Sequence, residues 1–449
     1  MLEHRGAKRS SITMQNARLL TTKRLEHNIM KRTIIAIISL VYAISCTAQF
    51  DKYFSNQTLR VDYYRDGCKG KETIRFKNFI AKPGEWAGST THLIDPFNYG
   101  AHRVMVVDAT TKTPLYSRTY NSLYHEYIAT EKGEKKVKKF EETVLIPYPK
   151  QAVDIQIQSR DKDWAFTTLE TFHFDPSSTK VEKVNNQVEV RKLHHSGNPH
   201  NKVDIAIVAD GYSINDTAKM RKDFATFVSG IVKYKPFSQH KEDINVWGVA
   251  AISEDSGITN PLKKKYLKTA VGSTFNSFEI DRYIMTFEIH TMHDVLQHCP
   301  YDHIIVMSNT DTYGGGAIYN FYADVTTGDQ AMFTVTHELG HLFGGLADEY
   351  VDPGVTYNDI HDLTREPLEP NITTLVNFDE KWKHLVEEGV PVPTPIKKEY
   401  LKKVGAFEGG GYQAKGIYRP MVRCMMNTGG NFCPVCVEAL EKMFKIYTE

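Results

Sequence analysis

The sequence lacks the features that would assign it to a special class of protein. Its 449 residues hold no dominant low-complexity tract, and 41% of them are hydrophobic and 24% charged, which excludes a disordered, collagen-like or coiled-coil chain. Lysine and arginine (55) balance aspartate and glutamate (54), so no basic excess points to a nucleic-acid partner. At roughly 150 residues per domain, the length allows two or three globular domains.

Long apolar runs are also missing, and the one short run near the N-terminus belongs to a segment typical of a secretory signal. From Met30 the sequence reads MKRTIIAIISLVYAISCTAQ, in which two cations precede the apolar run and small residues follow it. The run is too short for a permanent membrane span. We therefore expect residues 1–29 to be a mis-assigned start and residues 30–48 a signal peptide that is cleaved after Ala48. A cytoplasmic extension on a membrane anchor is the alternative.

The predicted location is therefore secreted, periplasmic or at the cell surface, with no membrane span in the mature form. Cys46 adds the possibility of a lipoprotein, because the residues around it partly resemble a lipobox. Once residues 1–48 are removed, acidic side chains slightly outnumber basic ones. A mildly acidic exported chain agrees with a soluble protein, not with binding to a polyanion or a membrane surface.

Three of the five cysteines that remain after this processing cluster near the C-terminus, at Cys424, Cys433 and Cys436. An oxidising compartment favours at least one disulfide among them, and the odd count leaves at least one thiol unpaired. The alternative is a structural zinc held by the three thiolates. That site needs a fourth ligand, which the local sequence does not offer.

Two regions with different patterns of apolar and polar residues indicate a multi-domain protein. Residues 49–175 contain short alternating runs bounded by turns, such as 58–64, which predicts an all-β sandwich. Residues 176–202 are rich in proline, serine, asparagine, lysine and histidine and are expected to be a linker. Residues 203–449 form the predicted second domain.

Strands and helices alternate in this second domain. Residues 203–211 form a continuous apolar run, as in a strand that is buried on both faces. Further strands are expected at 244–252 and 303–308, with helical sequence between them, including 216–233. This order predicts an α/β (α+β) domain.

The segment from Asp329 to Tyr350, DQAMFTVTHELGHLFGGLADEY, carries the chemistry. His337 and His341 are four residues apart, so on a helix their imidazoles project from one face and can reach a single Zn²⁺. Glu338 would lie beside the metal, where it can act as general base. An H-E-x-x-H pattern also occurs by chance. The apolar helix around this one, the glycine pair after it and the export signal all favour a zinc site.

Catalytic zinc takes three protein ligands and keeps one position for water. Gly344 and Gly345 can end the helix and reverse the chain, and a ligand just after such a turn is the metzincin arrangement. We prefer Asp348 as the third ligand. Glu349, or a more distant residue, remains an alternative.

At this point the sequence resembles a known family. His337–His341 together with Leu346–Tyr350 is similar to the M64 peptidases, the immunoglobulin A peptidase family of mostly bacterial secreted metalloproteases. The likeness extends to five further segments: Val208–Tyr212, Gly405–Tyr412, Tyr418–Pro420, Cys424–Asn427 and Phe432–Cys436. It covers most of residues 200–449, and the preceding β-rich region resembles the N-terminal domain of such peptidases.

The resemblance implies a metzincin-like zinc metalloprotease domain, with His337, His341 and Asp348 as ligands of one catalytic Zn²⁺ and Glu338 as base. It also implies a methionine turn beneath the metal, for which Met426 is preferred over Met425 because it keeps the Cys-x-Met spacing. The sequence departs from the commonest metzincin pattern. It has aspartate in place of the third histidine, with one extra residue before it.

The leading hypothesis is a secreted zinc endopeptidase that acts on protein or peptide substrates through a zinc-activated water. We expect substrate to lie extended along an edge strand within residues 309–320, although a mobile loop would explain the glycines there equally well. Three tyrosines are candidates to stabilise the oxyanion: Tyr350, Tyr412 and Tyr418. The alternatives are a surface adhesion protein whose β domain binds a host protein or glycan, with a residual zinc site, and a zinc hydrolase of non-peptide amides.

Overall fold

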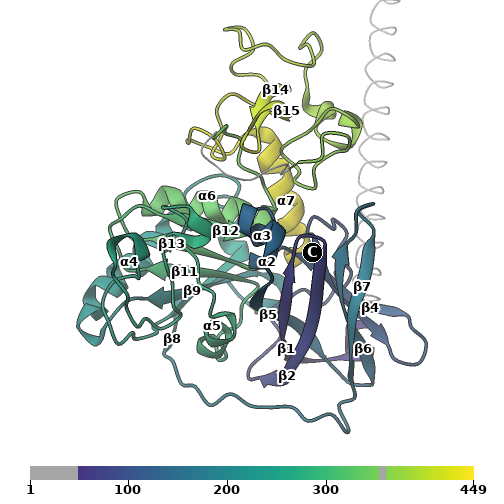
Figure 1. Cartoon of the computed structure of the whole chain (residues 1–449), viewed down its shortest axis with the longest axis vertical. Helices are drawn as coiled ribbons and strands as arrows, with labels where there is room; N and C mark the ends of the chain where they lie inside the picture. The colour runs from purple at the N-terminus through teal and green to yellow at the C-terminus, as the bar shows by residue number, and fades with distance from the viewer. Residues whose placement is uncertain (1–48, 353–360) are drawn as a thin grey trace, which may run out of the picture. The chain divides into compact units, whose positions relative to one another are not determined.

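The computed structural model describes residues 49–352 and 361–449 (Figure 1). The predicted signal peptide, the start before it and Cys46 lie outside these ranges. Every element below belongs to one compact unit, Tyr53–Glu449. Within the described ranges, no helix combines the length and the apolar character needed to cross a membrane.

The N-terminal region of this unit is built on two antiparallel sheets. The first, in the order β2-β1-β5, contains β1 (Phe54–Cys68), β2 (Lys71–Lys82) and β5 (Lys138–Pro149). The second, in the order β4-β3-β6-β7, contains β3 (His102–Asp108), β4 (Pro114–Tyr120), β6 (Val153–Arg160) and β7 (Phe166–Phe174). Two short helices precede β5, namely α2 (Leu123–Ile128) and α3 (Glu131–Lys135). The region is thus two sheets with two short helices, not strands alone.

A six-stranded mixed sheet forms the centre of the second region, in the order β12-β13-β11-β9-β10-β8. Its strands are β8 (Val190–His194), β9 (Val203–Asp210), β10 (Ile244–Val249), β11 (His303–Ser308), β12 (Gly315–Ile318) and β13 (Tyr322–Thr326). The four inner strands are parallel, whereas β12 and β8 pair antiparallel at the two edges. Strand β8 lies within the expected linker, which therefore contributes an edge strand to the sheet.

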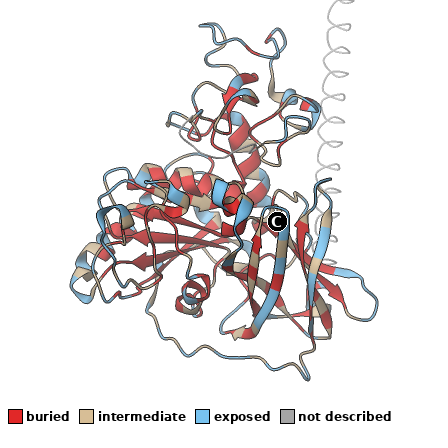
Figure 2. Ribbon diagram, viewed as in Figure 1, coloured by how far each residue is buried: buried red, intermediate tan, exposed pale blue. Residues whose placement is uncertain are grey.

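The side chains of β9 alternate between two hydrophobic cores, as the period of a strand requires. Ile205 and Ile207 face a core that includes α4 (Thr217–Ile231) and α6 (Ala331–Gly344). Ala206 and Val208 face a second core with α5 (Ile289–Val295). Because helices cover both faces, the strand is buried along its whole length, which explains its continuous apolar sequence (Figure 2).

The chain after α6 brings distant segments back to this helix. A short hairpin, β14 (Phe407–Gly410) with β15 (Gln413–Arg419), precedes the final helix α7 (Pro434–Thr448). Phe343 of α6 packs against Phe444 of α7, with ring centroids 4.9 Å apart. The loop between β15 and α7 can therefore contact α6, and this loop carries Met425, Met426, Cys424 and Cys433 of the sequence motifs, whereas Cys436 lies in α7.

Candidate active site

Helix α6 places His337 and His341 one turn apart with their ring nitrogens converging. Their Nε2 atoms are 3.3 Å apart. Asp348 Oδ1 lies 3.0 Å from Nε2 of His337 and 3.4 Å from Nε2 of His341. Four-coordinate zinc with bonds of about 2.1 Å separates its ligand atoms by about 3.4 Å. The three predicted ligands are thus brought together at a spacing that fits one zinc ion.

The outer nitrogens of both imidazoles are held by main-chain carbonyls. Nδ1 of His337 is 3.0 Å from the carbonyl oxygen of Met425, and Nδ1 of His341 is 2.5 Å from that of Leu346. A carbonyl can only accept, so each Nδ1 carries a proton, and each Nε2 is the nitrogen that a metal ion at the shared point would bind in place of a proton. This is the tautomer that a metal site requires.

The side chain of Asp348 is also held in place by a hydrogen bond to one of its carboxylate oxygens. The hydroxyl of Tyr412 donates a hydrogen bond to Oδ2 of Asp348, while Oδ1 has no hydrogen-bond partner within the described part of the chain. The side chain is 5% exposed, so its free acceptor is shielded from water. A buried acceptor that faces two imidazole nitrogens fits a bound cation.

The turn that delivers Asp348 is locally well defined. Gly345 ends α6 in the left-handed region, at φ 60°, where a residue with a Cβ is disfavoured. The side chain of Asn371 then bonds both main-chain groups of Ala347, at 2.7 Å and 2.9 Å. Asn371 carries no recognisable motif, and the sequence reading missed it.

Burial and the mutual charges of these groups shift their pKa values. Burial raises the pKa of Glu338, although the two imidazoles oppose it. Burial lowers the pKa of His341, but the carboxylate of Asp348 outweighs this and raises it to about 9. For Asp348 burial acts upward, yet the two imidazoles dominate and hold its pKa well below the usual range. Asp348 is therefore ionised at neutral pH.

Edge strand β12 runs beside Glu338. A Cβ added to Gly315 would lie 2.6 Å from Oε1 of Glu338 and 2.8 Å from Cγ2 of Thr334, so a larger residue here would force one of these side chains to shift. The predicted edge within residues 309–320 is confirmed as a strand at the border of the sheet. Its use by substrate stays a prediction.

A cleft of about 670 Å³ opens around these groups. Its wall includes Tyr350 and Tyr412, two of the three tyrosines expected near the oxyanion. Tyr418 is not among the described residues that line it; its main chain pairs with Thr373 instead. Arg282 and Tyr313 also face the cleft, and no motif had pointed to Arg282. Burial, with the nearby Glu338 carboxylate second, raises the pKa of Tyr313.

The N-terminal region also contributes to this cleft. Tyr99, Asn121, His125 and Glu126 line it, the last two from helix α2. No motif in the sequence had connected the N-terminal region with the active site. The structure makes it part of the wall of the cleft.

The loop of residues 420–433, between β15 and α7, is called the methionine loop here, and it packs against α6. A Cβ on Gly340, which lies between the two histidines, would approach Sδ of Met426 to 2.8 Å. Met425 instead supplies the carbonyl that holds His337. Both methionine side chains are fully buried. The two residues thus have different contacts, and the Met426 side chain packs against α6 at Gly340; its role as a methionine turn stays a prediction.

Glu349, the alternative third ligand, lies among the cysteines instead of with the histidines. Its Oε1 is 3.2 Å from Sγ of Cys436. The expected disulfide in this region is not formed: Cys436 Sγ is 3.7 Å from that of Cys424 and 3.6 Å from that of Cys433. A disulfide bond is about 2.05 Å long. The fourth group that the local sequence did not offer is Glu349.

A helix with two imidazoles and a carboxylate at a cleft, beside a mixed sheet, is the arrangement typical of metallopeptidases. Comparison with protein families supports this class. The model described as IgA Peptidase M64 matches residues 191–403 and 397–444, and the model described as Peptidase M64 N-terminus matches residues 49–171. The comparison with curated proteins found no match.

These matches cover most of the described chain, and the protein belongs to the M64 peptidase family. It therefore has the two-part architecture of an N-terminal M64 domain followed by a peptidase domain. Membership implies a peptidase that acts on protein or peptide substrates. The family resemblance expected from the residues around His337 and Asp348 is confirmed.

Proposed function

We propose that this protein is an exported, zinc-dependent endopeptidase with a metzincin-like catalytic domain. The observation that carries the proposal is the convergence of His337 Nε2, His341 Nε2 and Asp348 Oδ1 within 4.8 Å of one another. The glycine turn after α6, the antiparallel edge strand β12 and Met426 beneath the helix support the metzincin-like assignment. Export rests on the signal-like sequence of residues 30–48 alone.

His337, His341 and Asp348 would hold the ion. Zinc bound there would lower the pKa of a water molecule and polarise the scissile carbonyl. Glu338 accepts the proton of the attacking water and passes it to the leaving amine. Glu338 lies in the wall of the cleft directly after the proposed ligand His337, so its carboxylate is placed beside the site where water and the leaving amine would meet.

Tyr412 positions Asp348 through its hydrogen bond. Tyr350 and Tyr313 face the cleft with hydroxyl pKa values raised by burial. Both stay protonated at neutral pH and can donate to a developing oxyanion. Substrate would lie extended along β12, where main-chain hydrogen bonds bind it regardless of its side chains. The close approach of Gly315 to Glu338 then brings the substrate main chain near the base.

The test is proteolysis of casein by zinc-loaded protein, with and without a chelator. Glu338→Gln keeps the size of the side chain and should leave zinc bound, yet reduce kcat by at least about a hundredfold. Glu254→Gln, an exposed carboxylate outside the cleft, is the matched control and should cut normally.

Unchanged turnover in Glu338→Gln would reject the mechanism. A wild-type protein that binds zinc but cleaves neither casein nor a mixed peptide library would reject the peptidase proposal in favour of a surface binding protein. Peptides released from a mixed proteome, identified by mass spectrometry, would then map the specificity of an active enzyme.

A further inference from the structure

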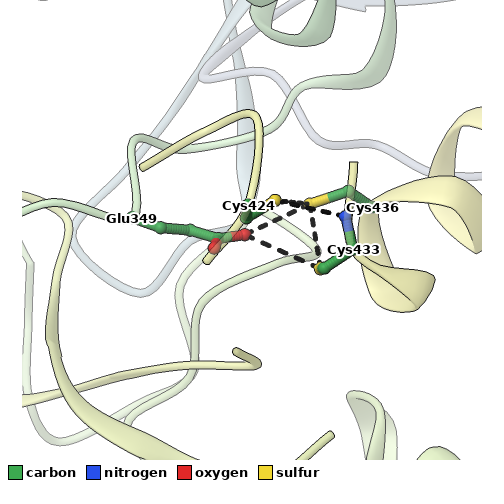
Figure 3. A group of neighbouring side chains, drawn as sticks. All are labelled: Glu349, Cys424, Cys433 and Cys436. Atoms are coloured by element: carbon green, nitrogen blue, oxygen red, sulfur yellow. Dashed lines mark hydrogen bonds between the residues drawn. The ribbon is translucent and has the colours of Figure 1, made fainter. Parts of the chain in front are cut away.

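Three cysteines and one glutamate meet in a cluster beside the candidate active site, drawn in Figure 3. Glu349 directly follows Asp348, and Cys424 lies in the methionine loop. Cys433 and Cys436 belong to the start of α7. All four side chains are at most 3% exposed. Segments far apart in sequence thus place four metal-binding groups at one buried point.

The spacing of the four donor atoms is that of a tetrahedral site. The sulfur of Cys436 is 3.7 Å from Cys424, 3.6 Å from Cys433 and 3.2 Å from Oε1 of Glu349. Cys433 Sγ is 4.0 Å from the same oxygen, and all four atoms lie within 4.8 Å of one another. Zinc with Zn–S bonds of about 2.3 Å separates its sulfur ligands by about 3.8 Å. A disulfide would require about 2.05 Å.

Glu349 is the member of the cluster whose burial ordinary hydrophobic packing does not explain. Glu349 is fully buried, and none of the salt bridges formed by the described residues includes it. Its Oε2 atom has no hydrogen-bond partner in the described ranges. Burying a carboxyl group without a salt-bridge partner and with an unsatisfied oxygen is costly. A bound metal ion would supply both the charge and the missing partner.

The start of helix α7 also lies at the cluster. The main-chain N–H of Cys433 donates to Sγ of Cys424 at 3.3 Å. Cys433 is the N-cap of α7, and Cys436 lies in its first turn. The N-terminus of a helix of 15 residues carries partial positive charge, which suits ligands that become anionic when a metal ion binds.

We infer that Glu349, Cys424, Cys433 and Cys436 bind a second zinc ion in a closed, structural site. Thiolate-rich, four-coordinate geometry selects zinc over magnesium or calcium. With four protein ligands, no position remains for water, so the site is not catalytic. Binding would expel the thiol protons to solvent as the metal–sulfur bonds form.

The second ion would hold the segment that carries Asp348 against the methionine loop. The N–H of Glu349 already donates to the carbonyl oxygen of Met426 at 2.6 Å, and the neighbouring carbonyl of Met425 holds His337. Glu349 belongs to the segment that carries Asp348, and Cys424 belongs to the methionine loop. An ion bound by both side chains would therefore link the two segments. The structural site would therefore stabilise the geometry around the catalytic ligands without touching substrate.

The test uses the full processed chain carrying Glu338→Ala, which prevents self-digestion. Elemental analysis should find two zinc ions per chain, and zinc-edge X-ray absorption should detect sulfur neighbours at about 2.3 Å. His337→Ala with His341→Ala should lose one ion and keep the sulfur signal. Cys433→Ser with Cys436→Ser should lose one ion together with the sulfur signal.

Absorption spectra with only nitrogen and oxygen neighbours would overturn the inference. So would alkylation and mass measurement that reveal a disulfide among these cysteines, or free thiols in zinc-saturated protein. These measurements need only the Glu338→Ala chain, so a cysteine variant that fails to fold does not obscure them. They are also independent of proteolysis, because the sulfur signal reports the cysteine site even if the histidine site binds nothing.

Discussion

Gly315 on the edge strand lies directly against the carboxylate of Glu338 on α6. The space there is too small for a methyl group, since a Cβ would come within 2.6 Å of Oε1. The proposed base and the proposed substrate strand are therefore packed against each other with nothing between them. This contact depends on one glycine, whose replacement gives the first prediction.

Gly315→Ala should displace Glu338 and lower kcat by at least about tenfold, since small misplacements of a catalytic group are costly. The atoms nearest to the added methyl group belong to Glu338 and Thr334 and not to the proposed zinc ligands, so zinc content should stay unchanged. Steady-state kinetics with a peptide substrate and elemental analysis measure the two effects. Unaltered kcat in the folded variant would show that Glu338 tolerates displacement, against the proposed role.

Tyr412→Phe removes the hydrogen bond to Oδ2 of Asp348. Loss of such an outer-shell partner should weaken zinc affinity by about ten- to a hundredfold, as measured by competition with a chelating dye. Tyr350→Phe is the matched control. Its ring packs against that of Tyr412 at 5.3 Å, and its zinc affinity should equal that of the wild type. Equal affinities in both variants would contradict a positioning role for Tyr412.

Asp324 should make stability fall as pH rises. Burial raises its pKa to about 7 in the folded chain, against about 3.9 when unfolded. The folded state thus binds the proton more tightly. The stability contributed by this proton is fully present below about pH 4, and the free energy of unfolding falls by on the order of 4 kcal/mol between about pH 4 and pH 7 before it levels off.

Asp324→Asn removes this titration while its side-chain oxygen can still accept from Ser308, which lies 2.6 Å away in the wild type. Urea unfolding between pH 5 and pH 8 should therefore show a flatter profile for the variant. Both proteins are compared in the same zinc buffer, so that the pH dependence of metal binding cancels. Parallel profiles would refute the assignment to Asp324.

The N-terminal region should affect substrate binding more than chemistry. Tyr99 lines the cleft and stacks on Phe97, with centroids 5.3 Å apart, but it does not touch the zinc ligands. Tyr99→Ala should raise KM for a long peptide severalfold and leave kcat and zinc content close to wild type. An equal loss of kcat would mean that the substitution disturbs the catalytic residues themselves.

Much of the local structure was predictable from neighbouring residues. The apolar runs at 203–211, 244–252 and 303–308 correspond to β9, β10 and β11, and 216–233 contains α4. Strand β8 was not predictable, because its partly exposed residues show no buried-strand pattern. It becomes a strand by pairing with β10. The helices α2 and α3 are too short for their sequence periodicity to be decisive.

By itself, the sequence determined that His337 and His341 share a helix face, because the period of a helix fixes residues four apart regardless of the rest of the chain. It also determined the family, through motifs that are local. Only the tertiary structure decided that Asp348 turns toward the histidines while its neighbour Glu349 turns toward cysteines, of which Cys436 lies 87 positions later. Contacts of that kind depend on the path of the chain between them, which no local pattern encodes.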